Sequence, residues 1–268
     1  MIENIKGFDA RTEQLMVEFG YKSQLGKLAI ATIRHRVQAI GWHHRSQNLK
    51  NPARSEKVKE LLRSAQRIES KAGRVPKKSL PITQEILEKL IKSIRPYTMI
   101  GKRNRAILSF GFYTGGRRRS EIAAAEYRFL SEYKGGFTYL LHRSKTDQSG
   151  HGSTKRLSRH RATPIRSWLK ASKIKDGYLF RRIFNNRVSD RPITGNLVNQ
   201  IIKDHIEAIG LNPKKYSAHG LRRGFVTTCS RRGFAMWDVM QKTGHKDIRT
   251  VKGYCEEVDA LKNPVNRL

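Results

Sequence analysis

Residues 217–254 have the sequence SAHGLRRGFVTTCSRRGFAMWDVMQKTGHKDIRTVKGY, in which side chains suited to chemistry recur at short intervals. It holds the motif His219-x-x-Arg222, then Gly244-His245, and then Tyr254 nine residues after that second histidine. A single His-x-x-Arg motif occurs often by chance. The ordered set, in which an imidazole, a guanidinium and a phenol stand beside glycines that shape the backbone, is far more specific.

Upstream, the segment Thr114–Ile122 reads TGGRRRSEI and directly follows the apolar run Ala106–Tyr113. An apolar run of this length predicts a buried helix. The next part of the chain predicts a small β-hairpin that carries Lys145. Its first strand is expected in the β-type residues 137–142, its turn in the polar, glycine-containing residues 146–154, and its return segment ends at Ile165. From Ile165 onward the pattern is helical again, and it is broken by two prolines.

The first 72 residues predict a helical domain. One helix is expected after Ser23 and another from about Ser55 to Ala72, each with apolar residues at helical spacing and a basic outer face. Residues 73–82 contain two prolines, a glycine and several basic side chains without apolar periodicity, which indicates a linker. The expected organisation is therefore a helical domain at 1–72, a linker at 73–82 and a second domain at 83–268.

The charge balance favours a polyanionic partner. The 268 residues include 55 Lys and Arg against 22 Asp and Glu, a formal net charge of +33. Nucleic acid is the default partner for such an excess. With two cysteines, no apolar run of about 18–20 residues and no secretion signal, we expect a cytoplasmic protein, associated with the nucleoid when on DNA, that does not bind membranes.

The second domain resembles the catalytic domain of the tyrosine recombinases, the phage integrase superfamily. The resemblance rests on five elements in a fixed order: the arginine of TGGRRRSEI, Lys145, His219-x-x-Arg222, His245 and Tyr254. The resemblance covers about residues 80–260. It implies a mainly α fold with a small antiparallel β-sheet, the DNA breaking-rejoining fold, preceded by a helical DNA-clamping domain. It also implies a site-specific recombinase that works through a 3′-phosphotyrosine and a Holliday junction, without metal, ATP or another cofactor.

By this resemblance, Tyr254 is the nucleophile, Arg118 and Arg222 hold the phosphate, and Lys145 protonates the leaving 5′-oxygen. His219 and His245 bond the phosphate and help to move the tyrosine proton, and Glu121 supports the active-site cations. The remaining basic candidates for DNA contact are Lys27, Arg34, Arg36, Arg45, Arg117, Arg119 and Arg223.

The first arginine has two candidates, because the family pattern Thr-Gly-x-Arg-x-Ser/Ala-Glu is one residue shorter than this segment. Counting forward from Thr114 selects Arg117, whereas counting back from Glu121 selects Arg118. Arg118 is preferred because Ser120-Glu121-Ile122 is expected to lie in the helix that fixes the pitch of the arginine.

The resemblance further implies double-stranded DNA recombination sites as substrate and a homotetramer on paired sites, with accessory DNA-bending proteins as further candidate partners. The N-terminal domain is expected to be short by one helix or more. Two other functions remain open: strand relaxation like that of a type IB topoisomerase, and DNA binding by a relative that has lost catalysis.

Overall fold

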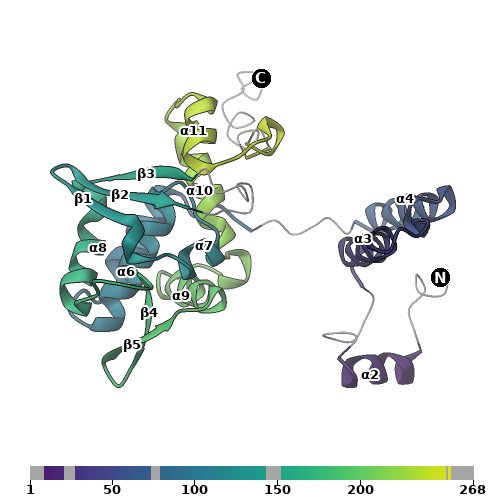
Figure 1. Ribbon diagram of the computed structural model, residues 1–268, viewed down its shortest axis with the longest axis horizontal. Coiled ribbons are helices and arrows are strands. Elements are labelled where there is room, and N and C mark those ends of the chain that lie inside the picture. Colours follow the sequence, from purple (N-terminus) through teal and green to yellow (C-terminus); the bar gives the residue numbers. More distant parts are fainter. Residues whose placement is uncertain (1–8, 21–27, 74–78, 143–151, 252, 255–268) are drawn as a thin grey trace. The chain divides into compact units, whose positions relative to one another are not determined.

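The computed structural model describes residues 9–20, 28–73, 79–142, 152–251 and 253–254. The chain divides into two compact units, residues 1–77 and 78–268 (Figure 1). Within the described residues, no helix combines the length and the apolar content that a membrane span requires.

The described part of the first unit is helical, with α2 (Ala10–Glu18), α3 (Ile30–Ser46), the 3-10 turn η1 (Pro52–Arg54) and α4 (Glu56–Lys71). The expected helix at 55–72 is confirmed, because Ser55 caps α4 by accepting a hydrogen bond from the Val58 amide. The helix expected after Ser23 is present but begins later than predicted, at Ile30, because Leu28 and Ala29 are not helical and Ala29 is its N-cap; residues 21–27 lie outside the described part. Gly41 of α3 is buried where η1 packs closely on the helix, and a Cβ there would lie 2.7 Å from Asn51.

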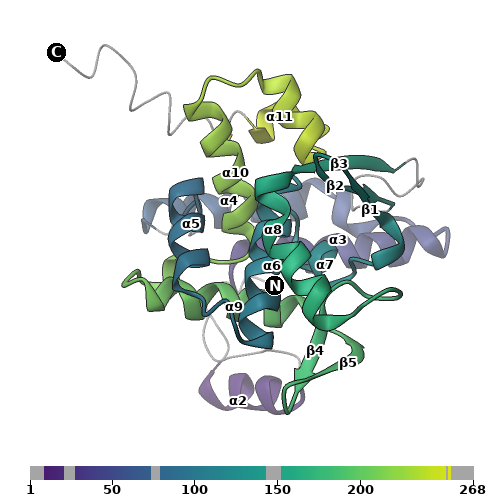
Figure 2. The ribbon, with the colours of Figure 1, turned by 90° about the vertical axis from the view of Figure 1, so that its left-hand side faces the viewer.

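The second unit is built around α6 (Met99–Tyr113), which is buried along most of its length, as its apolar sequence predicted. Helices α5 (Gln84–Ser93), α8 (Arg159–Ser172) and α9 (Gly195–Ala208) pack around it (Figure 2). The remaining helices are α7 (Arg119–Ala123), α10 (His219–Arg231) and α11 (Met236–Thr243), with the 3-10 turns η2 (Tyr127–Phe129) and η3 (Pro213–Lys215).

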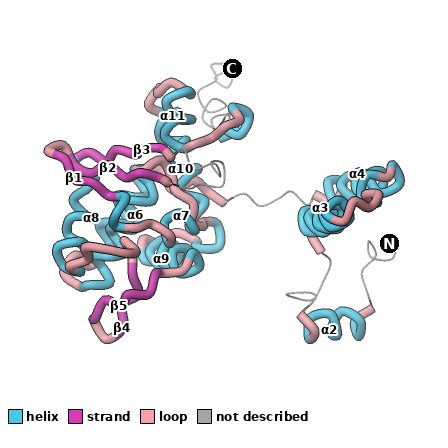
Figure 3. The backbone as a smooth tube through the Cα atoms, in the orientation of Figure 1, coloured by secondary structure: helices cyan, strands magenta, loops and turns pink. Residues whose placement is uncertain are grey.

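Two small antiparallel sheets accompany these helices (Figure 3). The first has the order β1 (Leu130–Tyr133), β2 (Gly136–Leu141) and β3 (Ser153–Ser158), and Tyr139 pairs with Lys155 across β2 and β3. The second is the hairpin β4 (Arg181–Phe184) and β5 (Arg187–Pro192). The predicted fold class, mainly α with a small antiparallel sheet, is therefore confirmed.

Three local predictions in this unit were wrong. The region after Ile165 is not continuously helical, because Asn185 and Asn186 adopt positive φ angles of 46° and 61° and close the β4–β5 hairpin. The return strand does not reach Ile165, because β3 ends at Ser158 and α8 begins at the next residue. The sheet also has a third strand, β1, where no strand was expected.

Candidate active site

Two glycines bring the turn after α6 against two later helices. Gly115 and Gly116 have φ angles of 105° and 68°, which residues other than glycine rarely adopt. A Cβ on Gly115 would lie 2.3 Å from the Lys242 carbonyl oxygen, and one on Gly116 would lie 2.4 Å from the Cα of Arg222. Only glycine fits both places, so the TGG sequence places the arginines that follow it beside α10 and α11.

Arg117 is buried, with 1% of its surface exposed. Its Nη2 faces three carbonyl oxygens, those of Gly115 at 3.2 Å, Lys242 at 3.0 Å and Thr243 at 3.2 Å. Burial lowers the pKa of this guanidinium, and Glu121, 3.7 Å from its Nη1, acts in the opposite direction. Arg117 thus joins the α6–α7 turn to the end of α11.

Arg118 is more open, with 27% of its side chain exposed. Its Nη1 lies 2.5 Å from one oxygen of Glu121, and the second oxygen accepts the backbone N–H of Arg118 at 3.1 Å. Glu121 is almost fully buried and contacts both arginines. This carboxylate therefore fixes the start of α7 and the orientation of Arg118.

The first turn of α10 supplies His219 and Arg222. Arg222 is 2% exposed, and its Nη1 donates to the carbonyl oxygens of Thr243 at 2.7 Å and Gly116 at 3.3 Å. Its Nη2 is buried and has no hydrogen-bond partner among the described residues. Burial, then Arg117 and Arg118, lower the pKa of Arg222 to about 10, a value at which it stays charged near neutral pH. A buried, charged donor of this kind suits an anion.

The tautomer of His245 follows from its neighbours. The Nε of Arg222 donates to His245 Nε2 at 3.1 Å, so that nitrogen is the acceptor. The other nitrogen, Nδ1, lies 2.7 Å from Thr243 Oγ1 and carries the proton. Burial, followed by Arg222, Arg118 and Arg117, lowers the pKa of His245 to about 3. The imidazole is therefore neutral and fixed near neutral pH.

Tyr254 lies beside both histidines. Its Oη is 3.2 Å from His219 Nε2, and its ring centre is 6.1 Å from that of His245. The Arg223 guanidinium lies over the ring at 5.5 Å. Burial, then Arg222 and Arg223, lower the pKa of His219, so its imidazole is neutral near pH 7 and able to accept the phenol proton.

The structure brings together most of the residues that the sequence singled out: Arg117, Arg118, Glu121, His219, Arg222, Arg223, His245 and Tyr254. Arg119 is exposed instead and donates to Asn196 Oδ1 at 3.1 Å. Arg34, Arg36 and Arg45 are exposed on α3 of the first unit. Lys145 and Lys27 lie outside the described residues.

Sequence reasoning missed two lysines at this site. Lys155 on β3 is 3% exposed, and its Nζ donates to the Gln241 carbonyl oxygen at 2.8 Å. Lys242 on α11 donates to the Arg156 carbonyl oxygen at 2.6 Å. A signal for Lys155 exists in the strand alternation, because Lys155 and Leu157 share the buried face of β3.

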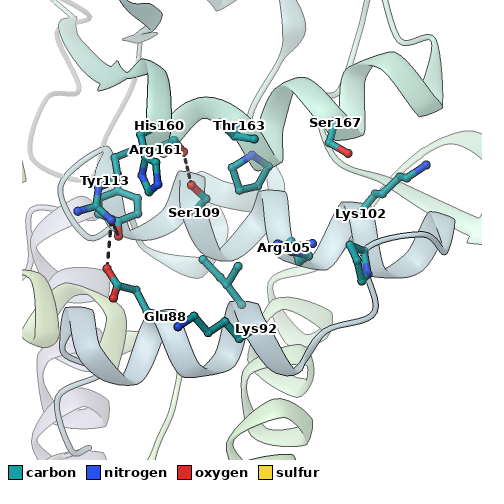
Figure 4. A pocket seen from close by; sticks show the side chains of 13 residues that line it. Glu88, Lys92, Lys102, Arg105, Ser109, Tyr113, His160, Arg161, Thr163 and Ser167 are labelled. Carbon is teal, nitrogen blue, oxygen red and sulfur yellow. Dashed lines mark hydrogen bonds and ion pairs between the residues drawn. The ribbon is translucent and has the colours of Figure 1, made fainter.

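A cavity of about 370 Å³ opens at this cluster and is lined by Arg117, Arg118, Thr243 and His245, among others. A larger one, about 490 Å³, lies elsewhere, between α5, α6 and α8 (Figure 4). Arg161 there contacts Glu88 at 3.2 Å and the Tyr113 hydroxyl at 2.6 Å, a network that joins the three helices. The larger cavity contains none of the predicted catalytic residues. The described residues also include no group of three or more His, Cys, Asp or Glu side chains placed to hold a metal ion.

Comparison with known proteins places the second unit in a family. The model of the phage integrase family matches residues 81–260. An integrase/recombinase XerD homologue of Selenomonas ruminantium is 28% identical over 253 residues, which cover 88% of this chain and 72% of that protein.

Two solved structures share the fold. The XerH site-specific recombinase, in a post-cleavage complex with its palindromic difH substrate, has a TM-score of 0.56 at 19% identity. That match covers 70% of this chain and only about half, 54%, of XerH. The Tn1549 transposon integrase, in complex with transposon right end DNA, has a TM-score of 0.54 at 14% identity, and the match covers 97% of this chain and 96% of that one.

Proposed function

The chain belongs to the phage integrase family, and from that premise we propose that it is a site-specific tyrosine recombinase that cleaves and rejoins DNA. The observation that carries the proposal is the phenol of Tyr254 within hydrogen-bond reach of a neutral imidazole, next to a buried arginine whose Nη2 has no partner among the described residues. Nucleophile, base and anion-binding donor are the three groups that phosphoryl transfer to a protein side chain requires.

In the proposed reaction, His219 Nε2 accepts the phenol proton while Tyr254 Oη attacks the scissile phosphorus. A bond forms between Oη and phosphorus, the bond from phosphorus to the 5′-oxygen breaks, and a 3′-phosphotyrosine results. Arg222 and Arg118 stabilise the negative charge that develops on the non-bridging oxygens. Lys145 remains the predicted proton donor to the leaving 5′-oxygen.

Rejoining reverses these steps with a 5′-hydroxyl from the partner duplex. One phosphodiester is exchanged for one phosphotyrosine, and then the reverse, so each step conserves a phosphate ester and neither ATP nor a metal ion is needed. We further propose that four copies act on two paired sites through a Holliday junction, and that Arg34, Arg36 and Arg45 on α3 contact the DNA backbone.

The test uses a pool of duplexes with randomised cores, each nicked close to the core so that the short 5′-hydroxyl fragment diffuses away after cleavage. The wild-type protein is expected to form an adduct that withstands denaturant, and sequencing the trapped DNA identifies the site. Absence of any adduct across the pool contradicts the proposal. Relaxation of a supercoiled plasmid without joining of two duplexes indicates a topoisomerase instead.

The pH dependence of cleavage is expected to reflect His219. Because burial and nearby arginines lower the pKa of this imidazole below its ordinary value of 6.5, its neutral form predominates at and above pH 6.5. The adduct-formation rate should therefore fall as the pH is lowered and the base takes up a proton, with the midpoint of this fall below pH 6.5. A single-turnover pH series with the selected nicked duplex measures this. A His219→Gln variant that keeps the same acid limb contradicts the assignment.

The two candidate arginines are distinguished by comparing cleavage with stability. Arg118→Gln is expected to slow adduct formation by about 100-fold, because one phosphate donor is lost, with little change in thermal stability. Arg117→Gln is expected to lower the free energy of unfolding by about 2–3 kcal/mol, because buried carbonyl oxygens on α11 lose their donor. Single-turnover rates and urea unfolding of both variants measure the difference. The reverse pattern assigns the phosphate contact to Arg117.

A further inference from the structure

Strand β3 and helix α11 are joined by two reciprocal lysine contacts, which we call the lysine clasp. Lys155 Nζ, from β3, donates to the carbonyl oxygen of Gln241 on α11 at 2.8 Å. The next residue of α11, Lys242, donates back to the carbonyl oxygen of Arg156 on β3 at 2.6 Å. Each element thus supplies one ammonium group and one carbonyl oxygen from adjacent residues.

Burying an ammonium group costs free energy, because the charge loses its hydration, so the position of Lys155 calls for a functional explanation. Lys155 is 3% exposed, and a lysine is rarely buried to that degree without a paired carboxylate. An apolar side chain would suit the buried face of β3, where its neighbour Leu157 points the same way. The cation lies beside the candidate active site, where it contacts the last turn of α11.

The last three carbonyl oxygens of α11 all receive hydrogen bonds from cations. Lys155 donates to that of residue 241, Arg117 to those of residues 242 and 243, and Arg222 to that of residue 243. The C-terminal carbonyls of a helix have no partners within the helix and carry partial negative charge. Gly244 then turns the chain with a φ of 73°, and His245 follows at once.

We propose that Lys155 is a positioning residue for the recombinase reaction, holding the last turn of α11 so that His245 and the two arginines stay in register. The inference rests on the proposed function. Lys155 acts through the backbone and touches no substrate. Lys242 joins the same two elements, β3 and α11, through the reciprocal contact with the Arg156 carbonyl oxygen.

The charged and titratable groups that act on Lys155 are Arg117, Lys242, Arg222 and Glu121. Burial, then the three cations in that order, lower the pKa of Lys155 to about 8, and Glu121 opposes them. Lys155 is therefore mostly charged below pH 8 and loses its charge as the pH rises through that value. A neutral amine still donates a hydrogen bond, but a weaker one.

The test compares Lys155→Met, which keeps the length of the side chain but removes the donor, with Lys155→Gln, which keeps a neutral donor. Lys242→Met removes the other half of the clasp, and Lys170→Met, at an exposed position on α8, is the matched control. Single-turnover cleavage of the selected nicked duplex at saturating protein separates the chemical step from DNA affinity.

Lys155→Met is expected to slow cleavage by about 30-fold with DNA affinity changed less than threefold, Lys155→Gln to slow it less, and Lys170→Met to leave it unchanged. The ratio of wild-type to Lys155→Met rates is expected to shrink from pH 7 to pH 9, as the wild-type lysine loses its proton. A ratio that stays constant across this range, or a Lys155→Met rate equal to wild type, overturns the proposal.

Hydrogen exchange of the DNA-free protein keeps the test independent of catalysis. The amides of Gly244 and His245 donate to the Met240 carbonyl oxygen at 2.7 and 3.2 Å. Their exchange is expected to speed up at least 10-fold in Lys155→Met and in Lys242→Met, while exchange in α8 is unchanged. Unchanged exchange at these amides overturns the positioning role even if the wild-type protein cleaves no DNA, and a wild type without an adduct contradicts only the proposed function.

Discussion

Tyr254→Phe is expected to abolish the covalent protein–DNA adduct, with adduct formation reduced by at least about 10⁴-fold. The substitution removes the oxygen that attacks phosphorus and leaves the ring, which still packs beside His245 and under the Arg223 guanidinium. One hydrogen bond, to His219, is lost from the fold, which costs about 1 kcal/mol in the free energy of unfolding. Denaturing gel electrophoresis of a labelled nicked duplex measures the adduct.

The matched control is Tyr97→Phe, at a tyrosine that is 73% exposed. It is expected to form the adduct at the wild-type rate, and both variants are expected to bind DNA as the wild type does. An adduct that persists in Tyr254→Phe means that another residue attacks, and mass spectrometry of the DNA-linked peptide then identifies it.

The fold could be predicted where local sequence is decisive. The apolar run at 106–113 gave α6, and the Ser55 cap with its periodic apolar residues gave α4. The β4–β5 hairpin was not predicted, because it depends on a turn at Asn185-Asn186, where both asparagines adopt a positive φ. The return segment predicted to end at Ile165 is a strand only as far as Ser158, and Pro164 lies inside α8. These errors concern short strands, turns and boundaries, and they leave the predicted fold class intact.

The candidate site also contains residues that the sequence could predict and residues that it could not. His219, Arg222, His245 and Tyr254 were predicted to lie together because their order and spacing resemble those of the tyrosine recombinases. The structure places them side by side. Spacing alone could not separate Arg117 from Arg118, since one is buried on carbonyl oxygens of α11 and that contact joins residues 125 positions apart. The same limit hid Lys155, whose partner lies 86 residues away. Contacts between distant elements depend on packing, which no local pattern encodes.

Arg222→Gln is expected to slow adduct formation by about 10³-fold, a loss typical of removing a preorganised donor to a developing oxyanion. Three nitrogens of this guanidinium have separate tasks. Nε orients His245, Nη1 binds carbonyl oxygens of the α6–α7 turn and α11, and the buried Nη2 has no partner in the described part of the chain. A donor held ready in a site of low polarity interacts with an anion more strongly than one in water. The phosphate is therefore expected to lie against Nη2.

Comparison with Arg222→Lys separates charge from geometry. A lysine restores the positive charge but cannot supply three directed donors at once, so it is expected to recover less than a tenth of the lost rate. Single-turnover rates, with urea unfolding to confirm that each variant is folded, provide the measurement, and Arg187→Gln at an exposed position on β5 is the control. A rate for Arg222→Gln within tenfold of wild type contradicts the phosphate contact. Full recovery in Arg222→Lys contradicts the role of the guanidinium fork, because charge alone would then account for the stabilisation of the transition state.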